Sequence, residues 1–481
     1  MADEAAGGLF GVLPERAAPE ASGAGGVPRL RVPERRQVEL RAVSLDQLVP
    51  AEHRVRQVWA FAEGLDLTPL YARIKAVAGA PGHPPAEPRL LLALWLWATL
   101  DGVGSARELA RRCDEHLAYQ WLCGGVGVNH KTLGDFRVAH GGLLERLLTD
   151  GFAALLRAGI ASLERVAQDG MRVRAGAGAA SFRRRSTLEA CRKAAAASFR
   201  RRATLEACRK AAAARVAQLR AELAADPVAA SRRQAGARAR AARERQAPSG
   251  AGRHPLLRRR IGRRPMVERA LAAATALGRE RAARAGKDGS RATAQEPRAS
   301  TTDPQARVTK MADGGYRPAF NLQLASDTKS GLIAAVELDA GGSDQGRLGP
   351  MSDRLAERYG IRPAQHLADG GDTKLGDIAR LEEAGCQIFA PPPTPRDPSR
   401  DRHAPLPDDP PGVAAWRRRM GSDAARAIYR LRAATAECAN AQARNRGLIR
   451  FTVRGIAKAK AVALWFALAH NMARGWRLTT A

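Results

Sequence analysis

The stretch RVAQDGMRV, residues 165–173, decides the fold of this chain, because it closes a short apolar run with an acidic residue, Asp169, that is followed by glycine. Such a pattern indicates a carboxylate at the end of a buried strand. The stretch QHLADGG, residues 365–371, presents Asp369 in the same way. The two stretches therefore predict two strands, each with an aspartate near its end.

Between these stretches the sequence predicts more of the same sheet. Alternating apolar residues in AFNLQLASD (319–327) predict a strand, and GLIAAVELD (331–339) predicts the next strand after a short turn. Together with the strand of Asp169 they form a three-stranded meander. Two helices and a last strand are expected over residues 344–359, 374–384 and 387–391. This alternation predicts an α/β fold with a mixed sheet and flanking helices.

A third acidic residue, Glu437, lies in the middle of a helical stretch, RLRAATAECANAQARNRGL (430–448). Enzymes that cut phosphodiesters with two Mg²⁺ ions need two or three carboxylates from separate elements, because these cations prefer oxygen ligands. Asp169, Asp369 and Glu437 fit this requirement, and Mn²⁺ could replace Mg²⁺. Asp327 is the alternative if Asp369 does not contribute.

The N-terminal third is expected to be helical after a disordered leader. Residues 1–42 are rich in glycine, proline, alanine and charge, whereas residues 43–160 show helical periodicity. Two short helices separated by a glycine-rich turn predict a helix-turn-helix that binds DNA through Arg137 and His140. A plain helical bundle is the alternative, because the spacing of such helices is a weak signal.

Positive charge is concentrated in one segment. The chain has 79 Lys and Arg against 48 Asp and Glu, a formal charge of +31, and residues 171–300 hold 33 of the basic and 9 of the acidic side chains. An excess of this size favours a polyanion such as nucleic acid as partner. Weakly constrained Arg- and Ala-rich sequence from a GC-rich gene is the alternative explanation.

The basic segment contains a tandem duplication. SFRRRSTLEACRKAAAA (181–197) is followed at once by SFRRRATLEACRKAAAA (198–214), which has Ala203 where the first copy has Ser186. A shift of 17 residues rotates a helix by about 100°, so the two copies cannot place their apolar residues on one stripe. We predict a basic helical insertion over residues 181–300 in which one copy packs poorly or the helix breaks.

Cysteine usage and hydropathy indicate a reduced cytoplasmic protein. The six cysteines form no CxxC pair and have no histidine at zinc-ligand spacing. The longest uncharged apolar run, residues 90–100, has 11 residues where a membrane span needs about 20. The N-terminus starts acidic and lacks a continuous hydrophobic segment, so neither an export signal nor a membrane partner is expected.

Five stretches, taken in order, resemble bacterial insertion-sequence transposases of the DDE type. They are HKTLGDFR (130–137), the AQDG strand (167–170), TDPQARVTKMADGGYRPAFNLQLASD (302–327), LADGGDTKLGDI (367–378) and AECANAQARNRGLIRFTVRGIAKAKAVALWFALAHN (436–471). A single DG or DGG occurs in many turns, but the order and the long C-terminal match make the set specific. The resemblance implies an RNase H-like catalytic domain formed by residues 161–180 and 301–481 and interrupted by the insertion.

The resemblance also implies roles for the acidic residues. It makes Asp169, Asp369 and Glu437 the metal-binding triad, the same three that the residue pattern selects. The chain departs from the family at Asp372, where a tyrosine is common. An extra carboxylate there could disturb the loop or compete for metal.

Basic residues near the C-terminus are candidate DNA contacts. Arg430 and Arg444 each lie seven positions from Glu437, so all three share one face of a regular helix. Structural ion pairing is the alternative for these arginines. Further candidates in RFTVRGIAKAK, for which charged capping of the last helix is the alternative, are Arg450, Arg454, Lys458 and Lys460.

Together these features predict a DNA transposase that binds the terminal repeats of its insertion sequence, cleaves them with two Mg²⁺ ions and transfers the freed 3′ ends to target DNA. A homodimer or larger assembly on double-stranded DNA is expected, in the cytoplasm and associated with the nucleoid. The alternatives are a catalytically inactive DNA-binding descendant of such an enzyme and an RNase H-like nuclease without strand transfer.

Overall fold

The protein is described here from a computed structural model. The described residues are 42–77, 83–194, 264–288, 296–395 and 397–480, together with Arg36 and nine single positions between 206 and 221. The chain divides into two units, residues 1–44 and 45–481, and every element discussed below belongs to the second unit. Most of the predicted leader and most of the second copy of the duplication lie outside the described residues.

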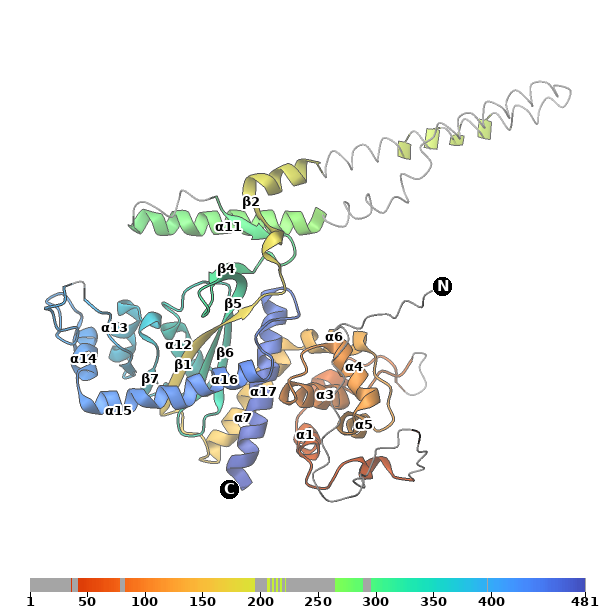
Figure 1. Ribbon diagram of the computed structural model, residues 1–481, viewed down its shortest axis with the longest axis horizontal. Helices are drawn as coiled ribbons and strands as arrows, with labels where there is room; N and C mark the ends of the chain where they lie inside the picture. The colour runs from red at the N-terminus through yellow and green to blue at the C-terminus, as the bar shows by residue number, and fades with distance from the viewer. Residues whose placement is uncertain are drawn as a thin grey trace, which may run out of the picture. The chain divides into compact units, whose positions relative to one another are not determined.

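The centre of the second unit is a mixed six-stranded sheet (Figure 1). Its strands are β1 (Arg165–Arg174), β4 (Arg307–Lys310), β5 (Tyr316–Asp327), β6 (Ile333–Asp339), β7 (Gln365–Leu367) and β8 (Gln387–Phe389). The order is β4-β5-β1-β7-β8, and β6 also pairs with β5. The predicted meander of β1, β5 and β6 is confirmed, since both of its pairings are antiparallel.

The two parallel pairings place Asp169 and Asp369 on neighbouring strands, but β1 runs on to Arg174, so Asp169 lies in the middle of its strand and not near its end as predicted. β7 runs parallel to β1, with Ala167 opposite Leu367, and β8 runs parallel to β7. Asp169 follows Ala167 by two residues and Asp369 follows Leu367 by two residues. Because β7 ends opposite Ala167 while β1 continues, the parallel register brings the loop that carries Asp369 beside the part of β1 that carries Asp169.

Helices from the C-terminal half cover the sheet. They are α12 (Leu348–Tyr359), α13 (Leu375–Glu383), α14 (Pro411–Met420), α15 (Asp423–Arg432), the π-helical segment η4 (Ala433–Glu437), α16 (Cys438–Asn445) and α17 (Ile456–Thr480). A continuous helical run from α15 through η4 into α16 lies along β1 and β5 (Figure 1). The predicted long helix around Glu437 thus begins at Asp423, because the chain breaks after α14 at Gly421 and Ser422 caps the new helix.

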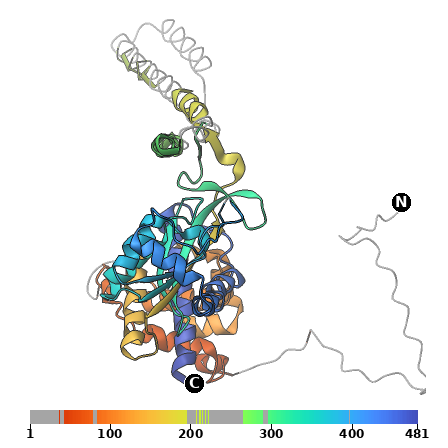
Figure 2. The ribbon, with the colours of Figure 1, turned by 90° about the vertical axis from the view of Figure 1, so that its left-hand side faces the viewer.

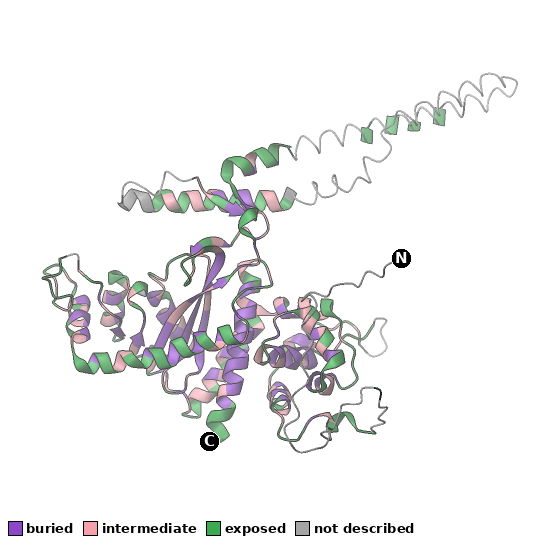
Figure 3. Cartoon of the chain, viewed as in Figure 1, coloured by how far each residue is buried: buried purple, intermediate pink, exposed green. Residues whose placement is uncertain are grey.

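The N-terminal helices share a hydrophobic core with the sheet. They are α1 (Arg54–Glu63), α2 (Thr68–Tyr71), α3 (Pro88–Leu100), α4 (Ala106–Glu115), α5 (Leu117–Cys123), α6 (His130–Ala139) and α7 (Gly141–Arg157). One continuous cluster of buried apolar residues includes Leu94 of α3, Leu322 of β5 and Leu464 of α17. Figure 3 shows α3 as an almost wholly buried helix and α17 as a helix buried along its middle and exposed at its C-terminal end. The last helix, α17, therefore packs against the sheet.

The basic insertion leaves the sheet through a short stalk. β2 (Phe182–Arg184) pairs antiparallel with β3 (Arg298–Ser300), and α11 (Arg264–Asp288) packs against them beyond β4 (Figure 2). A separate small core at this base contains Leu188, Ala270, Leu271, Ala274 and Ala299. The first repeat copy is thus anchored through Phe182 and Leu188, whereas its Cys191 is exposed. Within the described residues, no helix is both long and apolar enough to span a membrane.

Candidate active site

Asp169 lies on β1, an interior strand of the sheet, with its carboxylate directed at the helical run. Its Oδ2 accepts a hydrogen bond of 2.7 Å from Nδ2 of Asn440 on α16, and its Oδ1 accepts one of 2.7 Å from Nη2 of Arg432 at the end of α15. The Asp169 side chain keeps 20% of its surface exposed. A strand therefore supplies the acid, and the facing helices supply the groups that fix both of its oxygens.

Arg432 joins Asp169 to Glu437. Its Nη1 donates to Oε1 of Glu437 at 2.9 Å while its Nη2 holds Asp169, and only 10% of its own side chain is exposed. One guanidinium thus forms ion pairs with two of the three carboxylates predicted to bind metal. Its Nε is buried and, among the described residues, has no hydrogen-bond acceptor.

The π-helical segment explains why Arg432 meets Glu437. The two residues are five positions apart, which in a regular α-helix places them about 140° apart around the axis. In the segment Ala433–Glu437 the backbone makes wider i→i+5 turns, so positions five apart come close together. The same segment shifts the regular spacing between Arg430, Glu437 and Arg444 that the sequence predicted.

Asp369 belongs to the loop after β7, the strand that pairs with β1. It follows β7, its side chain accepts a 2.7 Å hydrogen bond from the backbone N–H of Gly370, and it is exposed. The negative charge of Asp369 contributes to raising the pKa of Asp169, Tyr429 and Arg432. The side chain of Asp372, where the chain departs from the family, lies outside the described atoms.

The three acids share one electrostatic environment. Burial raises the pKa of the Asp169 carboxyl, although Arg432 and the hydrogen bond from Asn440 act in the opposite direction. Burial also raises the pKa of the Tyr429 hydroxyl, and the carboxylates of Asp369, Glu437 and Asp169 add to this effect. For Arg432, burial disfavours the charge, but the surrounding carboxylates outweigh it and its pKa is raised.

The donor chemistry of this group fits a hard divalent cation. Its three carboxylates come from β1, the loop after β7 and the helical run, and carboxylate oxygens are the ligands Mg²⁺ and Mn²⁺ prefer. In the part of the chain that the structure describes, no three His, Cys, Asp or Glu side chains lie close enough together to hold a metal ion. Instead, the cationic group between Asp169 and Glu437 is Arg432.

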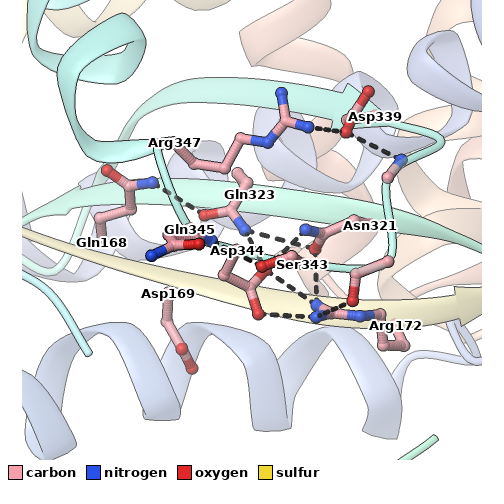
Figure 4. Close-up of polar contacts among 12 residues, drawn as sticks. Gln168, Asp169, Arg172, Asn321, Gln323, Asp339, Ser343, Asp344, Gln345 and Arg347 are labelled. Carbon is pink, nitrogen blue, oxygen red and sulfur yellow. Dashed lines mark hydrogen bonds and ion pairs between the residues drawn. The ribbon is translucent and has the colours of Figure 1, made fainter. Parts of the chain in front are cut away.

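The opposite face of β1 is fixed by a polar network centred on Asp344 (Figure 4). Asp344 forms a two-pronged ion pair with Arg172 at 2.7 and 2.8 Å and accepts from Nε2 of Gln323 at 2.7 Å and Nδ2 of Asn321 at 2.5 Å. Successive side chains of a strand alternate between faces, and Figure 4 shows Asp169 pointing away from this network.

Gly170 makes room for that network. A Cβ atom at this position would overlap the side chains of Gln323 and Asp344. The glycine after Asp169 is thus required by packing on the far face of the strand, and not by a turn. The DG pattern therefore marks a position where the two faces of β1 differ: Asp169 faces the helical run, and Gly170 faces the network of Asp344.

The structure does not support two of the predicted DNA contacts. Arg137 is buried, with 8% of its surface exposed; it donates to the Gly104 carbonyl at 2.6 Å and to Thr452 Oγ1 at 3.2 Å and lies over the ring of Trp95. Burial lowers its pKa to about 10. Lys460 forms ion pairs with Glu145 and Glu337 at 3.1 and 3.5 Å. Both side chains are engaged in packing α6 and α17 into the core.

The remaining predicted contacts divide into two groups. His140 is half-buried between α6 and α7 against the ring of Phe136, and burial, followed by the charge of Arg73, lowers its pKa. The other five are exposed and, among the described residues, form no ion pair: Arg430, Arg444, Arg450, Arg454 and Lys458.

Asp327, the alternative to Asp369, has a structural role. Its side chain is fully buried and accepts hydrogen bonds from the backbone N–H of Leu163 and from both the N–H and the hydroxyl of Ser330. In the register of β1 and β5 it lies opposite Val166, near the start of β1 and three positions before Asp169. It closes the turn between β5 and β6 and is not a metal-ligand candidate.

Three residues of the site were not predicted from the sequence: Tyr429, Arg432 and Asn440. Each lies on the helical run within eight positions of Glu437, and each is polar on a stretch otherwise rich in alanine. The spacing of Tyr429 and Arg432 could have indicated them as site residues, because positions three apart lie on the same face of a helix.

Comparison with protein families agrees with this geometry. A model described as Transposase domain (DUF772) matches residues 43–139, and a model described as Transposase DDE domain matches residues 412–476. Neither the curated proteins nor the solved structures gave a match. The first family match covers α1 to α6, and the second covers the helical run of Arg432 and Glu437 with most of α17. The two matches support an insertion-sequence transposase of the DDE type.

Proposed function

We propose that this transposase binds the terminal repeats of its insertion sequence and cleaves and transfers DNA strands with Asp169, Asp369 and Glu437 as its metal ligands. The observation that carries the proposal is that Arg432 forms ion pairs with both Asp169 of β1 and Glu437 of the helical run, while Asp369 follows β7, the strand paired in parallel with β1. The parallel register of β1 and β7 and the acidic helix opposite them also support an RNase H-like fold for residues 161–180 and 301–481.

Each residue of the group has a distinct task in the proposed reaction. Asn440 orients Asp169 through its 2.7 Å hydrogen bond, so that this carboxylate stays directed at the helical run. Arg432 balances the negative charge of Asp169 and Glu437 and has to release at least one of them when a divalent cation binds. When bound between these acids, Mg²⁺ or Mn²⁺ would activate the attacking oxygen and stabilise the leaving oxygen.

DNA would be held by basic residues outside this group. Arg430, Arg444, Arg450, Arg454 and Lys458 are exposed and unpaired among the described residues, and the chain as a whole carries a formal charge of +31. Residues 43–160 would provide end recognition and residues 181–300 further phosphate contacts. Transposition requires two ends to be brought together, so a homodimer or larger assembly on double-stranded DNA, associated with the nucleoid in the cytoplasm, is part of the proposal.

Strand cleavage of a duplex carrying the element's own terminus tests this function. We expect metal-dependent nicking by the wild type and background levels from Asp169→Asn, Asp369→Asn and Glu437→Gln. Asp313→Asn, which changes an exposed turn acid paired only with Arg317 among the described residues, is the matched control and should cleave normally. Full cleavage by Asp169→Asn would overturn the assignment. Release of cleaved ends without joining to target DNA would instead favour a nuclease that lacks strand transfer.

A second candidate is a DNA-binding descendant that no longer cuts. The observation that favours it is the ion pairing of Arg432 with both Asp169 and Glu437, which leaves these carboxylates neutralised without metal. In that case wild type and all three acid variants would bind terminal DNA equally and none would nick it with Mg²⁺ or Mn²⁺.

A further inference from the structure

A basic pocket lies on the other side of α16 from the candidate active site. It has a volume of about 600 Å³, within the range of pockets that hold small ligands. Its lining comes from α1, from the end of α16 and from the end of α17: Arg54, Gln57, Gln442, Asn445, Arg446, Ala473, Trp476 and Arg477. None of these eight residues is acidic.

The three arginines of this pocket face it without carboxylate partners from the described part of the chain. Arg54, Arg446 and Arg477 form no ion pair there, and Arg446 has its Nη1 buried without a hydrogen-bond acceptor. Burial, together with the nearby charges of Arg54 and Arg477, lowers the pKa of Arg446. Three like charges facing one cavity repel one another, so a bound anion would relieve a cost that the free protein carries.

The uncharged lining adds a flat apolar surface and hydrogen-bonding amides. Trp476 is 42% exposed although it is a large aromatic residue. The amides of Gln57, Gln442 and Asn445 can each donate and accept hydrogen bonds. Nucleic-acid strands are bound by this combination, in which arginines hold phosphate, an aromatic ring stacks on a base and amides bind base edges.

We propose that this pocket binds a nucleotide of a DNA strand, with its phosphate on the arginines and its unpaired base on Trp476. The proposal deepens the proposed function and rests on it, since the nucleotide is taken to belong to the DNA that the protein processes. α16 connects the two sites: Asn440 contacts Asp169, and Gln442 and Asn445 on the same short helix line the pocket. A strand held here would enter beside the acids at a fixed distance.

The test is binding of full-length protein to a short single-stranded oligonucleotide and to a blunt duplex, each over a series of salt concentrations. Trp476→Ala removes the stacking surface, Trp476→Tyr restores an aromatic ring, and the double variant Arg54→Gln/Arg477→Gln removes two exposed charges. Arg107→Gln/Arg157→Gln, which removes two exposed arginines of α4 and α7, is the matched control for net charge. Arg446 is left intact because it packs over the ring of Phe466.

We expect Trp476→Ala to bind the single strand about tenfold more weakly, Trp476→Tyr to recover most of that affinity, and the duplex to be much less affected. The pocket double variant should lower the slope of log affinity against log salt by about 0.7 for each phosphate that is no longer neutralised, while the control double variant keeps the wild-type slope. Equal effects of the two double variants would overturn the proposal. So would full displacement of the oligonucleotide by inorganic phosphate alone, since this would reduce the pocket to a simple anion site.

The cleavage assay separates this proposal from the proposed function. Metal-dependent nicking by a wild type whose pocket variants bind like the controls would disprove only the pocket. Pocket-dependent binding of the single strand by a protein that never nicks DNA would support the pocket and disprove the enzymatic function. Absence of binding to either DNA form would disprove both.

Discussion

Arg432 and Glu437 are five residues apart and face each other across a π-helical segment, with Nη1 and Oε1 2.9 Å apart. The same guanidinium holds Asp169 at 2.7 Å. A change of local helical geometry therefore decides which cation neutralises the acids.

Replacing Arg432 by Gln should strengthen binding of Mn²⁺ in the absence of DNA. The variant removes a positive charge that competes for Asp169 and Glu437, and the removal of one charge at this range corresponds to an affinity gain of about tenfold or more. Titration calorimetry with full-length protein measures it. Arg430→Gln, on the same helix but exposed and unpaired among the described residues, should leave the affinity unchanged. Equal Mn²⁺ affinities in all three proteins would show that Arg432 does not compete with metal.

Asp169→Asn should abolish cleavage without destabilising the protein at neutral pH. Because the pKa of Asp169 is raised in the folded state, its protonated form contributes stability that is complete below the unfolded-state pKa and is lost as pH rises through the folded-state pKa. Wild type should therefore gain stability relative to the variant on acidification from about pH 7 to pH 4. Urea unfolding of both proteins at the two pH values checks the sign. If the wild type instead lost stability relative to the variant at the lower pH, the folded protein would favour the ionised form of Asp169 over the protonated form.

Lys458 and Lys460 on α17 offer a matched pair for DNA binding. Lys458→Gln should lower the salt-dependence slope for duplex DNA by about 0.9, the value for one phosphate that is no longer neutralised. Lys460→Gln should leave that slope intact and lower the free energy of unfolding by up to about 1 kcal/mol, because its charge is used on Glu145 and Glu337. Salt titration and urea unfolding of both variants give the answer. If Lys460→Gln instead lowered the salt-dependence slope and Lys458→Gln left it unchanged, Lys460 would be the DNA contact.

Arg137→Met should behave as a core substitution. It keeps an apolar side chain but removes the guanidinium that lies over Trp95 and donates both hydrogen bonds to Gly104 and Thr452, at a cost of about 1–3 kcal/mol in unfolding free energy. DNA affinity of the folded variant should match that of wild type. A stable variant with weakened DNA binding would contradict the structural role.

Gly170→Ala should destabilise the protein by about 1–3 kcal/mol, because the added methyl group overlaps Gln323 and Asp344. Gly142→Ala on α7 is the control, since no described atom lies within 4 Å of a Cβ there. That change should be neutral or stabilising by up to about 1 kcal/mol. Thermal unfolding of the two variants distinguishes them, and similar melting temperatures would argue against the close approach of Asp344.

The sheet could be predicted from the sequence because its signal is local. Alternation in residues 319–327 and the apolar runs before Asp169 and Asp369 identify buried strands, and the structure confirms β1, β5, β6, β7 and β8. β4 was missed, since RVTK is short and one of its faces is exposed. The start of α12 was placed four residues early, because Asp344 belongs to the polar network under β1 and not to the helix.

The site was harder to predict than the fold. Regular helical spacing associates Arg430 and Arg444 with Glu437, but the π-turns bring Arg432 there instead. Burial of Arg137 was not predictable, because an arginine on an amphipathic helix is ordinarily solvated and only its contacts with Trp95 and Thr452 reveal its place. The role of these acids in metal binding remains a prediction that the cleavage and Mn²⁺-binding experiments test.

The stalk formed by β2 and β3 has a consequence for how this gene can vary. The strands pair Phe182 with Ser300, so the 113 residues from 185 to 297 start and finish at neighbouring points on the protein. The entropy of closing a chain segment grows only with the logarithm of its length, so 17 additional residues between the two strands cost only about 0.15 kcal/mol more. An in-frame slippage event in this region should therefore change the stability of the fold very little. Insertions of quite different length can be inherited without disturbing the strand that carries Asp169.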